Sequence, residues 1–243
     1  MTERSSNTSL SGLYVFRKIR AFRQTWQEAG PRATLIYAAD QLLRHLRVGR
    51  AHCYLFVCQP VTTTMDRRFL ARNLTCRILQ DHDFDLLPDQ QSALEYRISQ
   101  NAIAVGAFVD DSPVATLWYT LGAYVEDEVR AMYTPLPAGQ AAWDFGVEVA
   151  PQFRVGRTFF TLWAAAMDTM SARGCKFSFS RINAVNTASV QAHKRLGAMT
   201  IGHANFVIIG NLQIAYSSHT PRIHLSLSSD NRPCYCLVAG PCA

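Results

Sequence analysis

A strand, a basic turn, a helix and a second strand follow one another in the middle of this 243-residue chain. The first strand, "WDFGVEV" from Trp143 to Val149, alternates cleanly, so that its apolar residues share one face of a sheet. A helix is expected from about Thr158 to Ala172, where Gly174 suits the C-cap, and "KFSFSRI" (Lys176–Ile182) alternates again. Strands joined by a crossover helix lie parallel in one sheet. This unit predicts a mixed α/β fold.

Further elements are predicted on either side of this unit. Asn186 opens a helix, "ASVQAHKRL", that ends at Gly197, and the run after it forms a hairpin that turns at Gly210. A helical pattern spans Asp83–Ser99, and Gly122–Gln140 reads as an irregular connection. Four earlier runs have the composition of strands, at Cys53–Cys58, Leu74–Leu79, Ala102–Val109 and Val114–Leu121. We therefore predict a mixed, largely antiparallel sheet with helices on both faces.

The net charge of +6 is concentrated at the N-terminus. Residues 1–50 contain nine Lys and Arg against three acidic residues, whereas the other 193 residues contain fifteen of each sign. Apolar residues recur at helical spacing on both sides of Gly30 and Pro31, which predicts a basic helical extension made of two helices. Such an extension can bind an anionic membrane surface or an acidic carrier protein. It can equally pack on the main domain with its charges in water.

The sequence also favours a compartment and a domain division. No apolar run is long enough to span a membrane, and the polar N-terminus lacks the apolar core of a secretion signal. We therefore expect a cytoplasmic protein, with peripheral membrane contact as an option. The C-x-C spacing of Cys234 and Cys236 suits a metal poorly, so no metal is expected. We predict a main domain over residues 51–221, then a loose tail with free thiols over residues 222–243.

The turn after Val149 has the composition of an anion site. In "VAPQFRVGRTFFTLW", a basic turn opens a helix, where free backbone N–H groups and the helix dipole favour negative charge. Phosphate loops usually carry two or three glycines, whereas this turn has Gly156 alone, flanked by Arg154 and Arg157. The two guanidinium groups can bind phosphate oxygens and offset the missing amide contacts.

Two segments, "VEVAPQFRVGRTFFTLW" and "NAVNTASVQAHKRLGAMTIG", resemble the GNAT acyltransferase superfamily. The second is the more specific, because Asn186, Ser189, Leu196 and Gly197 fall at the family's spacing. The resemblance implies that acetyl-CoA or a longer acyl-CoA binds the helix-opening loop through its phosphates. It also implies that the preceding strand parts from its neighbour at a bulge at Gly146, which admits the pantetheine arm. The donor-binding residues implied are Val147, Val149, Arg154, Val155, Gly156, Arg157, Thr158, Asn186 and Ser189.

The loop departs from the family's pattern. Counted from Pro151, Arg157 and Phe159 occupy the places of the family's two glycines. Counted from Gly156, the initial Gln or Arg becomes Phe153. The donor can therefore be either coenzyme A or an acidic acyl carrier protein, whose pantetheine arm is joined by a single phosphodiester. The basic extension suits such a partner.

Acyl transfer to an amine needs a group that takes a proton from the nitrogen. Glu148 and Asp144 are candidates because they lie on the polar face of an otherwise apolar strand, where burial raises a carboxyl pKa toward neutrality. Either can instead pair with an arginine or cap a loop. His193 stands where the resemblance places a Tyr that protonates the leaving thiolate. An imidazole can do this near pH 7, or His193 is an ordinary helix residue.

The resemblance therefore implies an N-acyltransferase that moves an acyl group from a pantetheine thioester to a small-molecule amine. The alternative is a non-catalytic protein of this fold that binds a CoA-like ligand or a membrane surface. Nucleic-acid binding is not expected, because the excess basic charge is confined to one arm with few aromatic residues to stack on bases. The sequence does not identify the acceptor. Acidic residues that can attract a cationic amine are Glu95, Glu126, Asp127 and Glu128.

Overall fold

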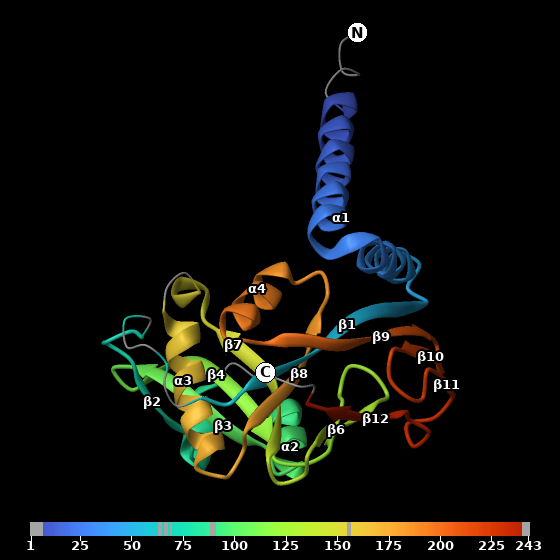
Figure 1. The fold of residues 1–243 in the computed structure, drawn as a ribbon. Coiled ribbons are helices and arrows are strands. Elements are labelled where there is room, and N and C mark those ends of the chain that lie inside the picture. The colour runs from blue at the N-terminus through green and yellow to red at the C-terminus, as the bar shows by residue number, and fades with distance from the viewer. Residues whose placement is uncertain are drawn as a thin grey trace.

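The computed structural model describes residues 7–62, 65, 68, 70–87, 91–154 and 157–239, with the backbone alone for residues 7–24 (Figure 1). The helices are α1 (Asn7–His45), α2 (Gln91–Ser99), α3 (Thr158–Ser171) and α4 (Thr187–Arg195). Short 3-10 helices lie at Asp81–Leu86 and Pro151–Phe153. The strands are β1 (Gly49–Pro60), β2 (Thr75–Ile78), β3 (Ile103–Val109), β4 (Ser112–Thr120), β5 (Tyr124–Val125), β6 (Met132–Leu136), β7 (Ala141–Val149), β8 (Phe177–Asn183), β9 (Met199–Ile209), β10 (Leu212–Ser217), β11 (Ile223–Ser226) and β12 (Cys234–Val238).

The strands form a large mixed sheet and a small second sheet. The large sheet has the order β11-β10-β9-β1-β8-β7-β4-β3-β2, and the small one the order β12-β6-β5. In the large sheet β7 and β8 pair in parallel through the α3 crossover, while the other described pairs are antiparallel. The mixed, largely antiparallel sheet predicted from the sequence is confirmed.

Helices cover both faces of the large sheet, as predicted. Trp163 and Met167 of α3 pack on one face together with Leu117 of β4. Leu94 of α2 packs with Trp118, the next residue along β4. Because consecutive residues of a strand point to opposite faces, α2 and α3 lie on opposite sides of the sheet.

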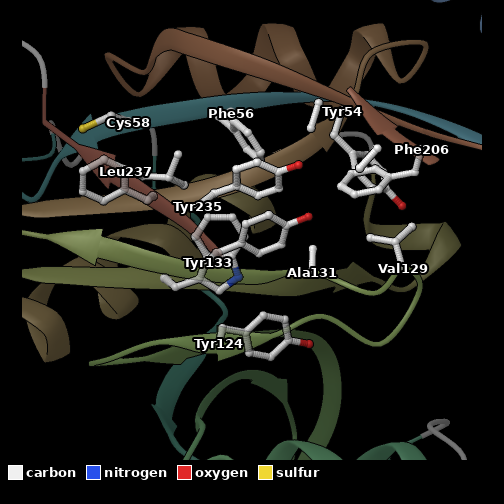
Figure 2. Packing of buried hydrophobic residues seen from close by; sticks show 14 of the residues in the cluster. Tyr54, Phe56, Cys58, Tyr124, Val129, Ala131, Tyr133, Phe206, Tyr235 and Leu237 are labelled. Carbon is white, nitrogen blue, oxygen red and sulfur yellow. The ribbon is translucent and has the colours of Figure 1, made fainter. Parts of the chain in front are cut away.

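The small sheet covers the α2 side of the large sheet with aromatic side chains. Figure 2 shows Tyr133 of β6 and Tyr235 of β12 next to Phe56 of β1. The rings of Tyr133 and Trp143 stack with centroids 4.4 Å apart, and those of Phe56 and Tyr133 meet edge-on at 5.5 Å. All four side chains are fully buried. This aromatic layer supports the β7 backbone next to the point where the candidate site begins.

The N-terminal extension consists of two helical segments that meet at Gly30, whose φ of 82° lies outside the helical range. The predicted break at this position is confirmed. The segment before the break projects from the body, and the segment after it lies against β1 (Figure 1). Within the described residues, no helix is long and apolar enough to cross a membrane.

The predicted loose tail is wrong over its described part, residues 222–239. β11 extends the large sheet by pairing with β10, and β12 pairs with β6. Tyr235 and Leu237 are fully buried, whereas Cys234 and Cys236, which alternate with them along β12, are exposed free thiols. The five-residue alternation of a short strand is weak in sequence, but its two apolar residues complete the aromatic core. Cys242 lies outside the described residues.

Two further predictions need correction. The segment Gly122–Gln140 is not an irregular connection, because it holds β5 and β6. The helical pattern over Asp83–Ser99 divides into α2 and the 3-10 helix that ends at Leu86; residues 88–90 lie outside the described part of the chain.

Candidate active site

β7 and β8 are paired over only part of their length and then separate. Their pairing runs from Ala141 opposite Phe177 to Trp143 opposite Phe179 and then stops. Beyond that point β7 follows β4, while β8 continues with β1. The backbone of Gly146 has a φ of +56°, and the β4–β7 register shifts beside it, so this is a bulge. The parting of the strands leaves the β8-side edge of β7 without a strand partner from residue 144 onward.

Two clefts open where the strands separate. The larger, of about 1330 Å³, is lined by the end of β7, the start of α3 and one side of α4. The smaller, of about 320 Å³, lies in the gap between β7 and β8. Four residues line both: Val147, Glu148, Asn186 and Ser189. Because they share these residues, the two clefts adjoin each other and together make up the candidate site.

The site gathers most of the residues singled out from the sequence. Val149 and Arg154 line the larger cleft, and Asp144 and His193 line the smaller. Val155 and Gly156 lie outside the described residues. Arg157 and Thr158 are not among the residues that line either cleft.

Asp144 sits at the inner end of the gap, one residue after the β7–β8 pairing ends. Its side chain is fully buried, and Ser178 Oγ donates a hydrogen bond to its Oδ2 at 2.5 Å. Burial raises the pKa of Asp144 to about 7, and hydrogen bonding to the carboxylate opposes the shift only in part. A carboxyl group with this pKa exchanges its proton near neutral pH, as a general base must.

Glu148 has a different environment from the one expected. The sequence argument for it rested on burial, but its side chain is exposed at the rim of both clefts. Burial therefore supports Asp144 and does not support Glu148. The difference follows from the bulge, because Asp144 lies where β7 is still inside the sheet.

His193 is buried behind the gap and contacts aromatic rings. Its imidazole meets the rings of Trp163 and Phe159 edge-on, with centroids 5.3 and 5.9 Å away. Its Nδ1 lies 3.2 Å from Oε1 of Gln59. Burial lowers the pKa of His193 to about 4, so the imidazole is neutral near pH 7. The expectation that it delivers a proton near pH 7 is therefore not supported.

Asn186 and Ser189 hold the start of α4 at the edge of the site. Asn186 Oδ1 accepts a hydrogen bond from the Ser189 backbone N–H at 3.1 Å, which is an N-cap. Both residues line the clefts as well. Capping and cleft lining are thus combined in one pair.

The two arginines of the basic turn differ in position. Arg154 lines the larger cleft, and its Nε donates to the carbonyl oxygen of Val149 at 2.9 Å. Arg157 is the N-cap residue of α3, and its side chain points to the exterior, being exposed. Thr158 is buried in the first turn of the same helix.

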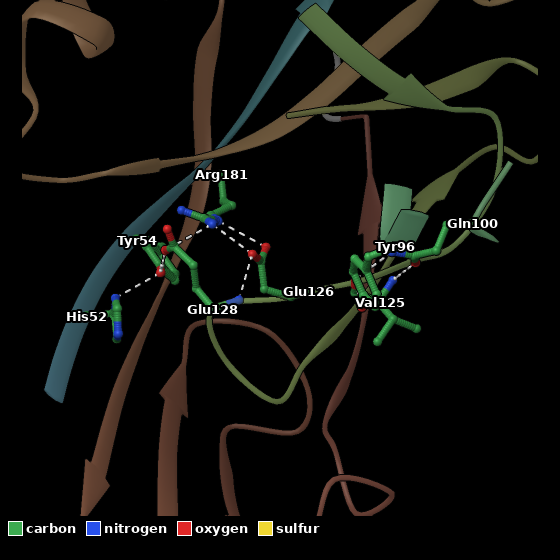
Figure 3. A network of polar contacts seen from close by, with 8 residues as sticks. All are labelled: His52, Tyr54, Tyr96, Gln100, Val125, Glu126, Glu128 and Arg181. Atoms are coloured by element: carbon green, nitrogen blue, oxygen red, sulfur yellow. Dashed lines mark hydrogen bonds and ion pairs between the residues drawn. The ribbon is translucent and has the colours of Figure 1, made fainter. Parts of the chain in front are cut away.

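An ion-pair network on the α2 side of the gap was missed in the sequence (Figure 3). Arg181 of β8 donates to both carboxylate oxygens of Glu126, at 3.0 and 2.7 Å, and its Nη2 lies 3.0 Å from Glu128. Tyr54 donates to Glu128 at 2.6 Å. Glu126 is buried, which raises its pKa, and Arg181 opposes that rise. The available signal was Arg181 itself, a charge at an inward position of an alternating strand.

The acidic loop 126–128 lines the gap and a further cavity. Glu126, Asp127 and Glu128 belong to the lining of the smaller cleft and also of a cavity of about 690 Å³ beside α2. The gap is therefore open toward this acidic loop on one side and toward the large cleft on the other. Glu95, by contrast, is exposed and accepts a hydrogen bond from Gln91. Within the described part of the chain, no three metal-binding side chains come together.

Comparisons with known proteins concern the fold. No protein-family model and no curated protein matches the sequence. A structure from Novosphingobium aromaticivorans, assigned to the GNAT family of acetyltransferases, has a TM-score of 0.46 and 17% identity, over 65% of this chain and 64% of that one. A tandem GNAT protein from the clavulanic acid biosynthesis pathway has a TM-score of 0.46 and 8% identity, over 70% of this chain and 57% of that one.

A third similar structure is the glucosamine N-acetyltransferase region of a fungal multi-domain beta-N-acetylglucosaminidase. Its TM-score is 0.48 and its identity 12%, over 69% of this chain and 22% of that one. This chain thus spans about two thirds or less of the length of each of these three structures. The fold itself, a mixed α/β fold, follows from the strand order and pairings of this chain.

Proposed function

We propose that this protein transfers an acyl group from a pantetheine thioester, acetyl-CoA or a longer acyl-CoA, to an amine. The observation that carries the proposal is the separation of β7 from β8, with the buried carboxyl group of Asp144 at the point where they part. A pantetheine arm, which is narrow and carries amide groups, can enter such a gap and form hydrogen bonds with the edge of β7 that faces β8. A sheet with its strands closed along their whole length offers no such entry.

On the donor side, three features support a phosphorylated thioester. The unpaired β7 edge offers backbone groups for the amides of a pantetheine arm and for the thioester carbonyl. The larger cleft continues to the start of α3, where the helix dipole favours a phosphate. Arg154 lines that cleft and adds a fixed positive charge.

The reaction follows from these positions. The amine nitrogen attacks the thioester carbonyl carbon, the C–N bond forms, the C–S bond breaks and the sulfur leaves as thiolate. Asp144 takes the proton that the nitrogen loses, directly or through one water, because its pKa of about 7 leaves much of it ionised at neutral pH. The thiolate is a good leaving group, so an acid at His193 is not required.

On the acceptor side, the charge balance favours a cationic amine. Glu126, Asp127, Glu128 and Glu148 line the smaller cleft together with two guanidinium groups, those of Arg97 and Arg181. Four carboxylates against two positive charges leave a net negative opening, which attracts an ammonium group. The acceptor loses a proton only after entry, next to Asp144.

Two measurements test the proposal. Acetyl-CoA should raise the thermal unfolding midpoint by mass action, and desulfo-CoA should do the same. Release of the free thiol with a panel of amines then measures turnover, which Asp144→Asn should lower roughly 10²–10⁴-fold while donor binding persists. Turnover with an acyl carrier protein and not with acyl-CoA would change the donor. Binding without turnover for every amine would favour the non-catalytic alternative, and absence of any binding would contradict the proposal.

A further inference from the structure

The segment of α1 after Gly30 is apolar on two sides. One side, with Ala33 and Ile36, packs against Cys53 of β1. The other carries a stripe spaced at three and four residues, which on a helix forms one continuous line. This leucine stripe consists of Leu35, Ala39 and Leu42 of α1 and of Leu46, which follows directly after the helix. Its three leucines are 58%, 57% and 57% exposed, so the stripe lies in water.

A second apolar patch lies on the same side of the large sheet. Cys53, which contacts α1, is directly opposite Asn205, and Asn205 is opposite Tyr216. Residues directly opposite each other on neighbouring strands share a face, so Tyr216 faces the α1 side. By the same register its neighbours share that face. This sheet patch consists of Ile214, Tyr216, Ile223 and Leu225, which are 39% to 67% exposed.

Charge indicates what covers the leucine stripe. Residues 1–50 hold nine basic and three acidic residues, and among them Arg32 and Arg47 are exposed next to the stripe in sequence. A second copy would bring another +6 against this region, and like charges repel. An acidic protein would match the basic charge, but its polar surface would offer no apolar contact to the exposed leucines. An anionic lipid surface supplies both an apolar layer and negative headgroups.

We propose that the leucine stripe of α1 and the basic residues around it bind an anionic membrane surface, with the helix lying in the headgroup region. The sheet patch on the same side of the molecule adds apolar contact. Binding of this kind is peripheral, and it does not depend on the acyl transfer proposed above.

The test uses the full chain and two kinds of vesicle, phosphatidylcholine alone and phosphatidylcholine mixed with phosphatidylglycerol. The protein should float with the mixed vesicles and not with the neutral ones. Raising the salt from about 0.1 M to about 0.5 M should weaken binding several-fold, because it screens the basic residues. Leu42→Glu and Leu35→Glu should each weaken it at least about tenfold, because each removes apolar contact and adds a like charge.

The matched control is Gln41→Glu. It introduces the same charge one residue away, at an exposed position off the stripe. Circular dichroism confirms that all three variants fold, since each replaces an exposed side chain. Equal loss in Leu42→Glu and Gln41→Glu would overturn the stripe, and equal flotation with neutral vesicles would overturn the anionic surface. A dimer in sedimentation velocity that Leu42→Glu dissociates, without vesicle binding, would assign the stripe to a second copy and overturn the proposal.

Discussion

Replacing Asp144 by Asn should make the protein more stable while lowering its turnover, and the gain in stability should depend on pH. Asn has nearly the shape of Asp and can still accept a hydrogen bond from Ser178. It cannot ionise. The substitution therefore removes the cost of burying a negative charge and leaves the packing around it in place.

The size of the effect follows from the pKa of the folded chain. The carboxyl group has a pKa of about 7 when buried and 3.8 in its ordinary state. Between these values the folded state keeps a proton that the unfolded state has lost, so raising the pH favours unfolding. Each pH unit in this interval costs about 1.4 kcal/mol, which amounts to about 4 kcal/mol above pH 7. Stability is fully present below pH 3.8 and is lost as the pH rises to about 7.

Denaturant unfolding of both proteins at several pH values measures this difference. Other titrating groups are common to the two chains and cancel when the two free energies of unfolding are subtracted. The advantage of Asp144→Asn should grow by roughly 3 kcal/mol between pH 5 and pH 7 and then become constant. An advantage that does not change with pH, or a loss of stability, would mean that Asp144 is not buried as an acid.

Three substitutions test other parts of the account. Gly146→Val should lower the free energy of unfolding by roughly 1–3 kcal/mol and weaken acetyl-CoA binding, because φ is +56° and a Cβ would meet Trp118 at 3.2 Å. Gly122→Ala, with open space around it, is the control and should change neither the free energy in denaturant unfolding nor the acetyl-CoA affinity in calorimetry. Asn186→Ala should lower the free energy of unfolding by about 1 kcal/mol, whereas Asn186→Ser keeps the N-cap of α4. If calorimetry finds the same donor affinity in both variants as in the unmodified protein, Asn186 acts only as a cap. Tyr235→Ala should cost roughly 3–5 kcal/mol in urea unfolding, and a loss below about 1 kcal/mol would contradict the packing of β12 in the core.

The strand–helix–strand unit was predictable because its signals are local. Trp143–Val149 alternates over seven residues, and Gly174, with a positive φ, lies in the turn that directly follows α3 and its C-cap Ala172. β12 was not predictable in the same way, because its five residues carry little signal until β6 provides a partner. Its place in the core is decided by contacts between segments about a hundred residues apart.

The candidate site was likewise predictable where its signals are local and not where it depends on contacts between distant segments. The gap at Gly146 could be anticipated from the family resemblance, and a glycine within an alternating strand suits the bulge that it requires. Which carboxyl group is buried could not, because Asp144 and Glu148 share one strand face in the sequence and only the bulge separates their environments. The pairing of Arg181 with Glu126 likewise joins residues that are far apart in the chain.

The claim that β7 and β8 part to admit a pantetheine thioester is tested most directly by nuclear magnetic resonance. Backbone amide shifts are recorded as coenzyme A is titrated into the protein, with Gly146→Val as the comparison. The account predicts shifts confined to residues 144–154, the first turn of α3 and residues 186–189, and their loss in the variant. Shifts elsewhere on the molecule, or an unchanged spectrum at saturating coenzyme A, would contradict it.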